Sequence, residues 1–137
     1  MNKIKVAINS MFTILAFLVG GIDKVFICLA ILMLMDYVTG IFKGIKNKNL
    51  NSKRGIEGII YKICIIFMII LAEQIDIITN QDVFRNLICY FFISNEGISI
   101  LENLSLLGLP IPEKITKFFE QLKKEEWLCN ILLILLI

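Results

Sequence analysis

The 137-residue chain contains no histidine, two prolines, one tryptophan and only 19% charged residues. The absence of histidine removes the commonest general base and the usual partner of a catalytic cysteine. The four cysteines have no paired spacing and stand among apolar residues, which argues against a zinc site; they are Cys28, Cys64, Cys89 and Cys129. The sequence also lacks a glycine-rich phosphate-binding loop. We therefore predict that the protein is not an enzyme and binds no cofactor and no metal.

Charge is scarce because apolar residues are abundant. Hydrophobic residues make up 58% of the chain, and the mean hydropathy is +0.82. Soluble domains are usually nearer to half apolar and a quarter charged. The formal net charge of +2 argues against a nucleic-acid-binding protein. The composition therefore predicts an integral membrane protein, and the length predicts a single domain over residues 1–137.

The apolar residues fall into four segments, which are residues 6–22, 25–42, 55–78 and 83–109. A glycine-containing turn at 20–24 separates the first two, and a polar turn at 80–82 precedes the fourth. The first segment resembles a signal peptide, but no convincing cleavage site follows, so we expect a retained helix. Residues 113–126 carry apolar side chains at helical spacing and predict an amphipathic helix. The last eleven residues, 127–137, would extend only about 16 Å as a helix and cannot span a bilayer.

These elements predict an all-α membrane protein with three to four transmembrane helices and a C-terminal amphipathic helix. Basic residues are distributed unevenly along it. Segment 43–54 holds five, the tail holds four and the N-terminus holds two, whereas the opposite ends hold only Lys24 and Arg85. By the positive-inside rule, segment 43–54 and both termini are expected in the cytoplasm, with four spans. The alternative has three spans, with the N-terminus outside and the first segment along the membrane surface.

The fourth segment carries a polar stripe. Its polar residues fall within an arc of about 120° on a helix; they are Asn95, Glu96, Ser99, Glu102 and Asn103. A carboxylate at the centre of a lipid-embedded helix costs roughly 2.5–3.5 kcal/mol, so such residues require protein partners or water. The stripe is therefore predicted to line a pore or a path, or to form a buried polar seam.

Polar and small residues also share faces in the second and third segments. In the second segment one face carries Asp36, Gly40, Lys43 and Gly44. The spacing of Gly40 and Gly44 favours close helix approach. In the third segment Gly58, Lys62, Glu73 and Asp76 lie on one narrow face. Each face is expected to pack within one protomer, or to meet a second protomer or water.

Depth in the membrane suggests one specific contact. Asp36 precedes Lys43 by seven residues, and Lys62 follows Arg54 by eight. Because the two segments run antiparallel across the basic connection, both side chains lie about 10–12 Å from it. An ion pair between Asp36 and Lys62 would lower the cost of inserting both charges.

Three blocks carry a resemblance to a known family. MDYVTGIFKG at 35–44, NSKRGIEGIIYKI at 51–63 and NEGISILENLSLLGLPIPEKI at 95–115 resemble the toxin-secretion/phage-lysis holins. The resemblance covers about residues 25–124. It implies a multi-pass protein of the bacterial cytoplasmic membrane that associates with itself and opens lesions for an endolysin or a toxin. The apolar end at 127–137 departs from the family, whose members usually finish with a charged tail.

Two other functions fit the same features. A small ion channel or transporter subunit would also use carboxylate-lined helices, and an antiholin would share the spans but block lesions. The sequence has no loop like a selectivity filter and no pair of broken helices, which favours the holin.

Overall fold

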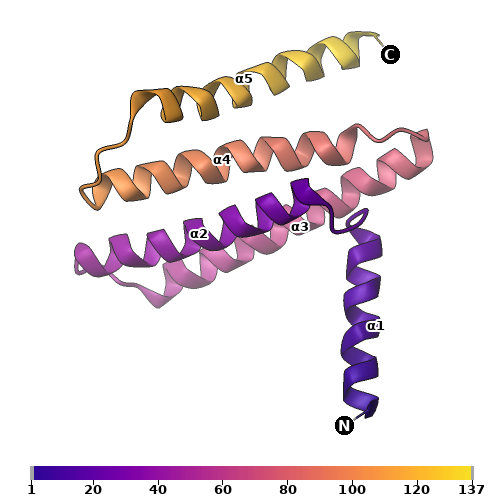
Figure 1. The fold of residues 1–137 in the computed structure, drawn as a ribbon, viewed down its shortest axis with the longest axis horizontal. Helices are drawn as coiled ribbons and strands as arrows, with labels where there is room; N and C mark the ends of the chain where they lie inside the picture. Colours follow the sequence, from indigo (N-terminus) through magenta and orange to yellow (C-terminus); the bar gives the residue numbers. More distant parts are fainter. Residues whose placement is uncertain (1, 137) are drawn as a thin grey trace.

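The structure is a computed structural model that describes residues 2–136, with side chains described for residues 2–124. Within this part the chain forms five helices (Figure 1): α1 (Asn2–Leu18), α2 (Lys24–Lys46), α3 (Ser52–Thr79), α4 (Phe84–Leu106) and α5 (Glu113–Leu136). The all-α prediction is confirmed for the described residues. The four expected apolar segments correspond to α1–α4, with ends shifted by up to four residues.

Helices α2, α3 and α4 form an antiparallel bundle, and α5 lies along α4 (Figure 1). Helix α4 packs against α2, α3 and α5, whereas α2 and α3 make few contacts with each other. Helix α1 projects from one end of the bundle, roughly at right angles to it (Figure 1), and none of its residues is buried. The bundle is therefore organised around α4.

The connections contain the residues that helix ends require. Gly20 adopts φ +77° after α1, and a Cβ there would lie 2.6 Å from the Glu73 carboxyl carbon. Asp23 then caps α2 by accepting a hydrogen bond from the Phe26 amide at 2.9 Å. After α3, Asn80 takes the left-handed conformation that commonly ends a helix. The turns expected at 20–24 and 80–82 are therefore present.

Asp76 of α3 caps the start of α4. Its carboxylate accepts hydrogen bonds from the backbone N–H groups of Val83, Phe84 and Arg85, at 3.1, 2.9 and 2.8 Å. The first N–H groups of a helix have no partner within the helix, and here a buried side chain from the preceding helix supplies one. The bend between α3 and α4 is fixed by this contact.

Replacing Asp76 with alanine is expected to destabilise the bundle by about 1–3 kcal/mol, because the N–H groups it binds lose their acceptor. Thermal unfolding of the purified protein in detergent would measure this loss. Asp82→Ala is the matched control, since Asp82 lies in the same connection and is exposed. Equal losses in the two variants would contradict the capping role.

The interior of the bundle is divided along its length. The half nearest α1 has an apolar centre, formed by Val19, Leu29, Met33, Ile65, Ile69, Cys89 and Ile93. At the α1 end of this half, Asp76 and Arg85 are also buried. In the half nearest the α2–α3 connection the interior becomes polar. The buried side chains there include Thr39, Glu96 and Asn103.

The exterior of the bundle is apolar. Large side chains such as Ile31, Leu34, Phe67 and Leu71 are each more than half exposed, a pattern that soluble proteins avoid. Among the described residues, α2 and α3 are long and apolar enough to cross a membrane. The expected count of three to four spans goes beyond this finding.

Helix α5 differs from its prediction. A helix was expected over 113–126 with a separate apolar end, but α5 continues without a break from Glu113 to Leu136. The predicted boundary followed a change in hydropathy, and that stretch contains no proline or glycine that would end a helix. The described apolar side chains of α5 are only partly covered, since Phe119 and Leu122 are half-buried while Ile115 and Phe118 are exposed.

Candidate functional site

Lys62 of α3 forms the centre of the polar half. Its Nζ lies 2.6 Å from Oδ2 of Asp36 on α2 and also forms an ion pair with Oε2 of Glu96 on α4. The expected Asp36–Lys62 pair is therefore confirmed, and Glu96 is an additional partner. We call these three residues the Lys62 triad. It joins all three helices of the bundle through charged groups.

Hydrogen bonds extend the triad toward the α2–α3 connection. Ser99 and Asn103 of α4 donate to Oδ1 of Asp36 at 2.5 and 3.3 Å. Asn103 also donates to Thr39 Oγ1 at 3.1 Å and accepts a hydrogen bond from Lys43 Nζ at 2.7 Å. The triad together with Ser99, Asn103, Thr39 and Lys43 is called the polar network below. It ties α2 to α4 over about two helical turns.

The stripe expected on α4 is split by the structure. Glu96, Ser99 and Asn103 point into the bundle and join the polar network. Asn95 is half-buried, and Glu102 is exposed. Glu102 lines a groove between α4 and α5 with Thr116 and Glu120. Of the five residues of the expected arc, only Glu96, Ser99 and Asn103 face α2 and α3.

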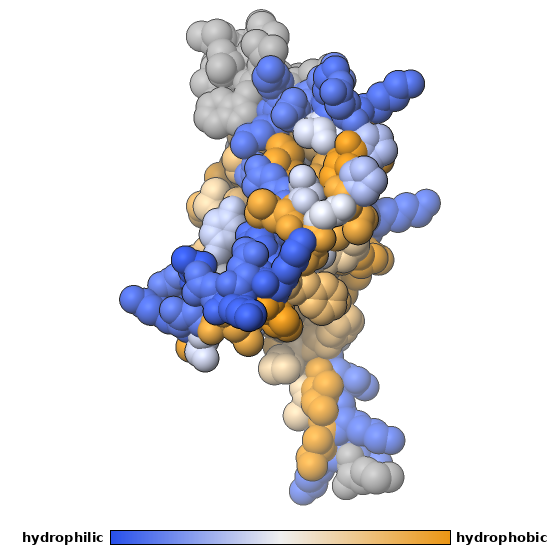
Figure 2. Space-filling view, turned by 90° about the vertical axis from the view of Figure 1, so that its left-hand side faces the viewer, coloured by the Kyte–Doolittle hydropathy of each residue, from blue (hydrophilic) through white to orange (hydrophobic). Residues whose placement is uncertain are grey.

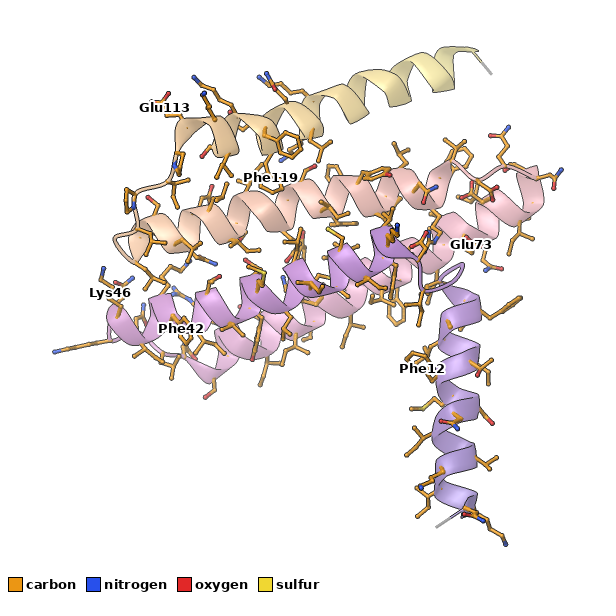
Figure 3. All side chains as sticks on the ribbon, viewed as in Figure 1. Phe12, Phe42, Lys46, Glu73, Glu113 and Phe119 are labelled. Carbon is orange, nitrogen blue, oxygen red and sulfur yellow. The ribbon has the colours of Figure 1, made fainter. Side chains whose placement is uncertain are left out.

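The other expected residues lie on inward faces. A Cβ on Gly40 would lie 4.0 Å from Asn103, and one on Gly58 would lie 3.7 Å from the Tyr37 ring. Gly44 faces the α2–α3 connection, where a Cβ would approach Leu50 to 3.3 Å. Glu73 lies on α3 beside the turn between α1 and α2 (Figure 3). Asp76 is the cap of α4 described above.

Arg85 is a structural residue that sequence reasoning treated only as a topological charge. It is buried, donates to the carbonyl oxygens of Val19 and Gly21 at 2.5 and 2.9 Å, and pairs with Asp23 at 2.8 Å. This fixes the α1–α2 turn on the start of α4. The Arg85 guanidinium lowers the pKa of Asp23, so the stabilisation from this pair is present at neutral pH and is lost as the pH falls through the lowered pKa. In the sequence, the one feature that could have indicated this role is the position of Arg85 at the start of an otherwise apolar segment.

A cavity of about 440 Å³ opens at the α2–α3 connection and reaches the polar network. Its inner wall contains Asp36, Ser99 and Asn103, and its outer wall contains Lys43 and Arg54. Figure 2 looks onto this end of the molecule and shows hydrophilic residues gathered over the α2–α3 connection. Beyond the triad the bundle is closed by its apolar half. The cavity therefore extends from the α2–α3 connection as far as Asp36 of the triad.

The charged groups of the polar network compensate one another. Removing ions from water is costly unless they are paired and hydrogen-bonded. Asp36 has three partners from the other two helices, and Lys62 has two carboxylates. The arrangement can hold charged groups inside an apolar bundle, and it orients the three helices relative to each other.

The outer face of α4 is covered by α5. Phe119 points from α5 toward α4 (Figure 3) and lies over Gly97, where an added Cβ would lie 2.6 Å from the Cδ1 atom of the ring. Gly97 and Ser94 are both buried. Only a residue without a side chain allows α5 to approach α4 this closely at Gly97.

Comparisons with known proteins agree with the resemblance in the sequence. The profile of the bacteriophage holin family matches residues 13–124. The chain is 41% identical over 127 residues to the "Uncharacterized 14.9 kDa protein in nagH 3′ region" of Clostridium perfringens, covering 91% of this chain and 96% of that protein. It is 35% identical over 102 residues to the "Probable holin" of Bacillus phage phi105, covering 74% and 75% of the two chains. No solved structure matches it.

Proposed function

The chain belongs to the bacteriophage holin family, and we propose that it acts as a holin that associates with itself in the bacterial cytoplasmic membrane. The resulting lesions would let a folded endolysin or toxin leave the cell. The observation that carries this proposal is the inverted distribution of polarity, with a largely buried polar network inside a bundle whose exterior is apolar. Such a bundle is suited to lipid and not to water.

A single chain has no room for a protein cargo. The interior of the bundle is filled by the apolar core in one half, and the cavity of about 440 Å³ ends at the triad in the other. A lesion that passes a folded protein therefore requires many copies, arranged around a hole that none of them encloses alone. This supports self-association as part of the function.

The placement that we propose has α2, α3 and α4 crossing the membrane. With 23 residues, α4 is about 34 Å long, enough for a hydrocarbon core of about 30 Å. Its polar residues Glu96, Ser99 and Asn103 are turned toward protein. Segment 43–54 faces the cytoplasm because of its five basic residues.

Helix α1 is proposed to lie along the outer surface of the membrane, as in the three-span alternative. It is roughly perpendicular to the bundle and has no buried residue (Figure 1). Asn2, Lys5, Asn9 and Thr13 fall on one side of it by helix geometry. Figure 2 shows a hydrophobic stripe along the projecting α1 with hydrophilic residues beside it. Such helices lie in the membrane interface.

Cysteine labelling would test this placement. In a variant without native cysteines, single cysteines at Asn2 and Asn80 are expected to react with an impermeant thiol reagent added to intact cells. Cysteines at Asn49 and Gln121 should react only after the cells are opened. Protection of position 2 would favour four spans, and external labelling of position 49 would overturn the proposed topology.

The charged residues of α5 imply a further step in lesion formation. Residues 113–124 carry two glutamates and four lysines, and Phe119 holds this part of α5 beside Gly97, which lies near the middle of α4. Each charge facing lipid at that depth would cost roughly 2.5–3.5 kcal/mol. We propose that α5 leaves α4 for the cytoplasmic interface as lesions form. The face of α4 around Ser94 and Gly97 would then be open to a second copy of the chain.

Inducible expression in bacteria with a cytoplasmic reporter enzyme would test the function. A holin is expected to release the folded reporter abruptly, after a delay during which the membrane stays intact. An ion channel or transporter subunit would change ion gradients without releasing the reporter. An antiholin would cause no release alone and would delay release by an active holin. The ion-channel result or the antiholin result would each replace the proposal.

A further inference from the structure

The outer part of the cavity at the α2–α3 connection holds two cations without an anionic partner. Lys43 donates to the neutral amide of Asn103, and neither Lys43 nor Arg54 has a carboxylate within ion-pair distance among the described side chains. Asp36 is the one acidic residue among those that line the cavity. It is already engaged by Lys62, Ser99 and Asn103.

The surrounding groups add positive potential and hydrogen-bond donors. Arg54 lies in the first turn of α3, a turn that contains no acidic residue, and helix N-termini favour anions. Asn47, Asn49 and Asn51 of the connection also line the cavity, and the side chain of Asn51 caps α3 by accepting a hydrogen bond from the Lys53 amide. In the inner part of the cavity, the carboxylate of Asp36 already has partners within the protein. At the mouth, the positive charges of Lys43 and Arg54 have no anionic partner among the described side chains.

The space itself depends on glycine. Gly44, Gly55 and Gly58 line the cavity, and Tyr37 stands between α2 and α3 beside the last two. A Cβ on Gly55 would meet the Tyr37 hydroxyl at 3.6 Å, an ordinary contact, so a longer side chain there would extend into the open space. The volume can therefore be filled without altering any charge.

We propose that this cavity binds a phosphate group, with Lys43 and Arg54 as its ligands. Guanidinium and ammonium groups are the usual partners of phosphate, and the planar donors of arginine fit its oxygens. The group could belong to an anionic phospholipid or to free phosphate. The lipid source rests on the proposed membrane placement, in which the mouth of the cavity lies at the level of the cytoplasmic headgroups. Basic pockets between helices at that level bind anionic headgroups.

The test uses the purified full-length chain in detergent micelles. The rise in its unfolding temperature would be followed as dioleoylphosphatidylglycerol, dioleoylphosphatidylcholine or inorganic phosphate is added, which gives an apparent Kd for each. Saturable binding of phosphatidylglycerol over phosphatidylcholine would identify an anionic phospholipid headgroup, because both lipids contain a phosphodiester and only the first has a net negative charge. Binding of inorganic phosphate as well would identify a site for the phosphate group alone.

Three variants separate this site from general attraction to a basic surface. Lys43→Gln/Arg54→Gln is expected to weaken binding by about tenfold or more. Gly55→Leu should weaken it similarly while keeping every charge. Lys123→Gln/Lys124→Gln removes the same charge from α5 and should change the Kd by less than about twofold. Should Lys43→Gln fail to fold, Arg54→Gln alone and Gly55→Leu retain the test.

The proposal is overturned if no probe binds saturably, or if the α5 control loses as much affinity as the cavity variants. Because binding is measured on purified protein, its failure is distinct from failure of the proposed lysis function, which reporter release tests in cells.

Discussion

Lys62→Met is expected to destabilise the bundle by about 3–5 kcal/mol, the range for removing one partner of a buried ion pair. The reason lies in the two-to-one stoichiometry of the triad. Without the ammonium group, Asp36 and Glu96 become two like charges inside the bundle, with only the hydrogen bonds from Ser99 and Asn103 to support Asp36. Asp36→Asn or Glu96→Gln should cost less, because each leaves Lys62 with one carboxylate.

Stability would be measured by thermal or denaturant unfolding of purified variants in detergent. A cycle that combines Lys62→Met with Asp36→Asn and Glu96→Gln should recover part of the loss, since the neutral triad has no unpaired charge. Lys46→Met is the matched control, because Lys46 is exposed and, among the described side chains, has no ion pair and donates to the Leu106 carbonyl at 3.2 Å. Strictly additive losses would show that the three groups are not coupled.

The Asp36–Lys62 pair could be predicted because depth along an antiparallel pair of helices follows from residue count alone. Glu96 could not be assigned to the same cluster by that argument. Its depth in α4 depends on where the fourth helix begins, and the cap supplied by Asp76 fixes that point. To predict a contact between three helices, one must know the residue at which each helix begins.

Helical periodicity predicted a face on α4 but not the direction in which it points. Asn95 and Glu102 lie at one edge of the arc, and the rotation of α4 turns that edge away from α2 and α3. The rotation is set partly by Gly97 on the opposite side, where Phe119 of α5 packs. The sequence does not show which helix a glycine accommodates.

Arg85 shows a different limit. Its acceptors include the backbone carbonyl groups of Val19 and Gly21, and every residue has such a carbonyl. Charge counting therefore assigned Arg85 to a surface. Its structural role becomes visible only when the turn between α1 and α2 is placed against the start of α4.

Phe119→Ala is expected to advance reporter release, because it removes one of the side chains that hold α5 against the bundle, beside Leu122, and leaves α4 unchanged. Phe119 is half-buried, so the loss of packing is about 1–2 kcal/mol, which corresponds to a roughly five- to thirtyfold larger population with α5 detached. Phe118→Ala is a matched control. Phe118 is 58% exposed and should add little to the α4–α5 contact.

The reverse experiment holds α5 in place. In a variant without native cysteines, Gly97→Cys/Phe119→Cys puts two thiols where the glycine and the ring meet, and the loss of the ring makes room for the new Cβ. A short thiol-reactive cross-linker should join them and prevent release, whereas the same variant without the reagent should still lyse. Full membrane insertion would be checked in each case. Release on the normal schedule from the cross-linked protein would exclude detachment of α5 as a step, and so would equal effects of Phe118→Ala and Phe119→Ala.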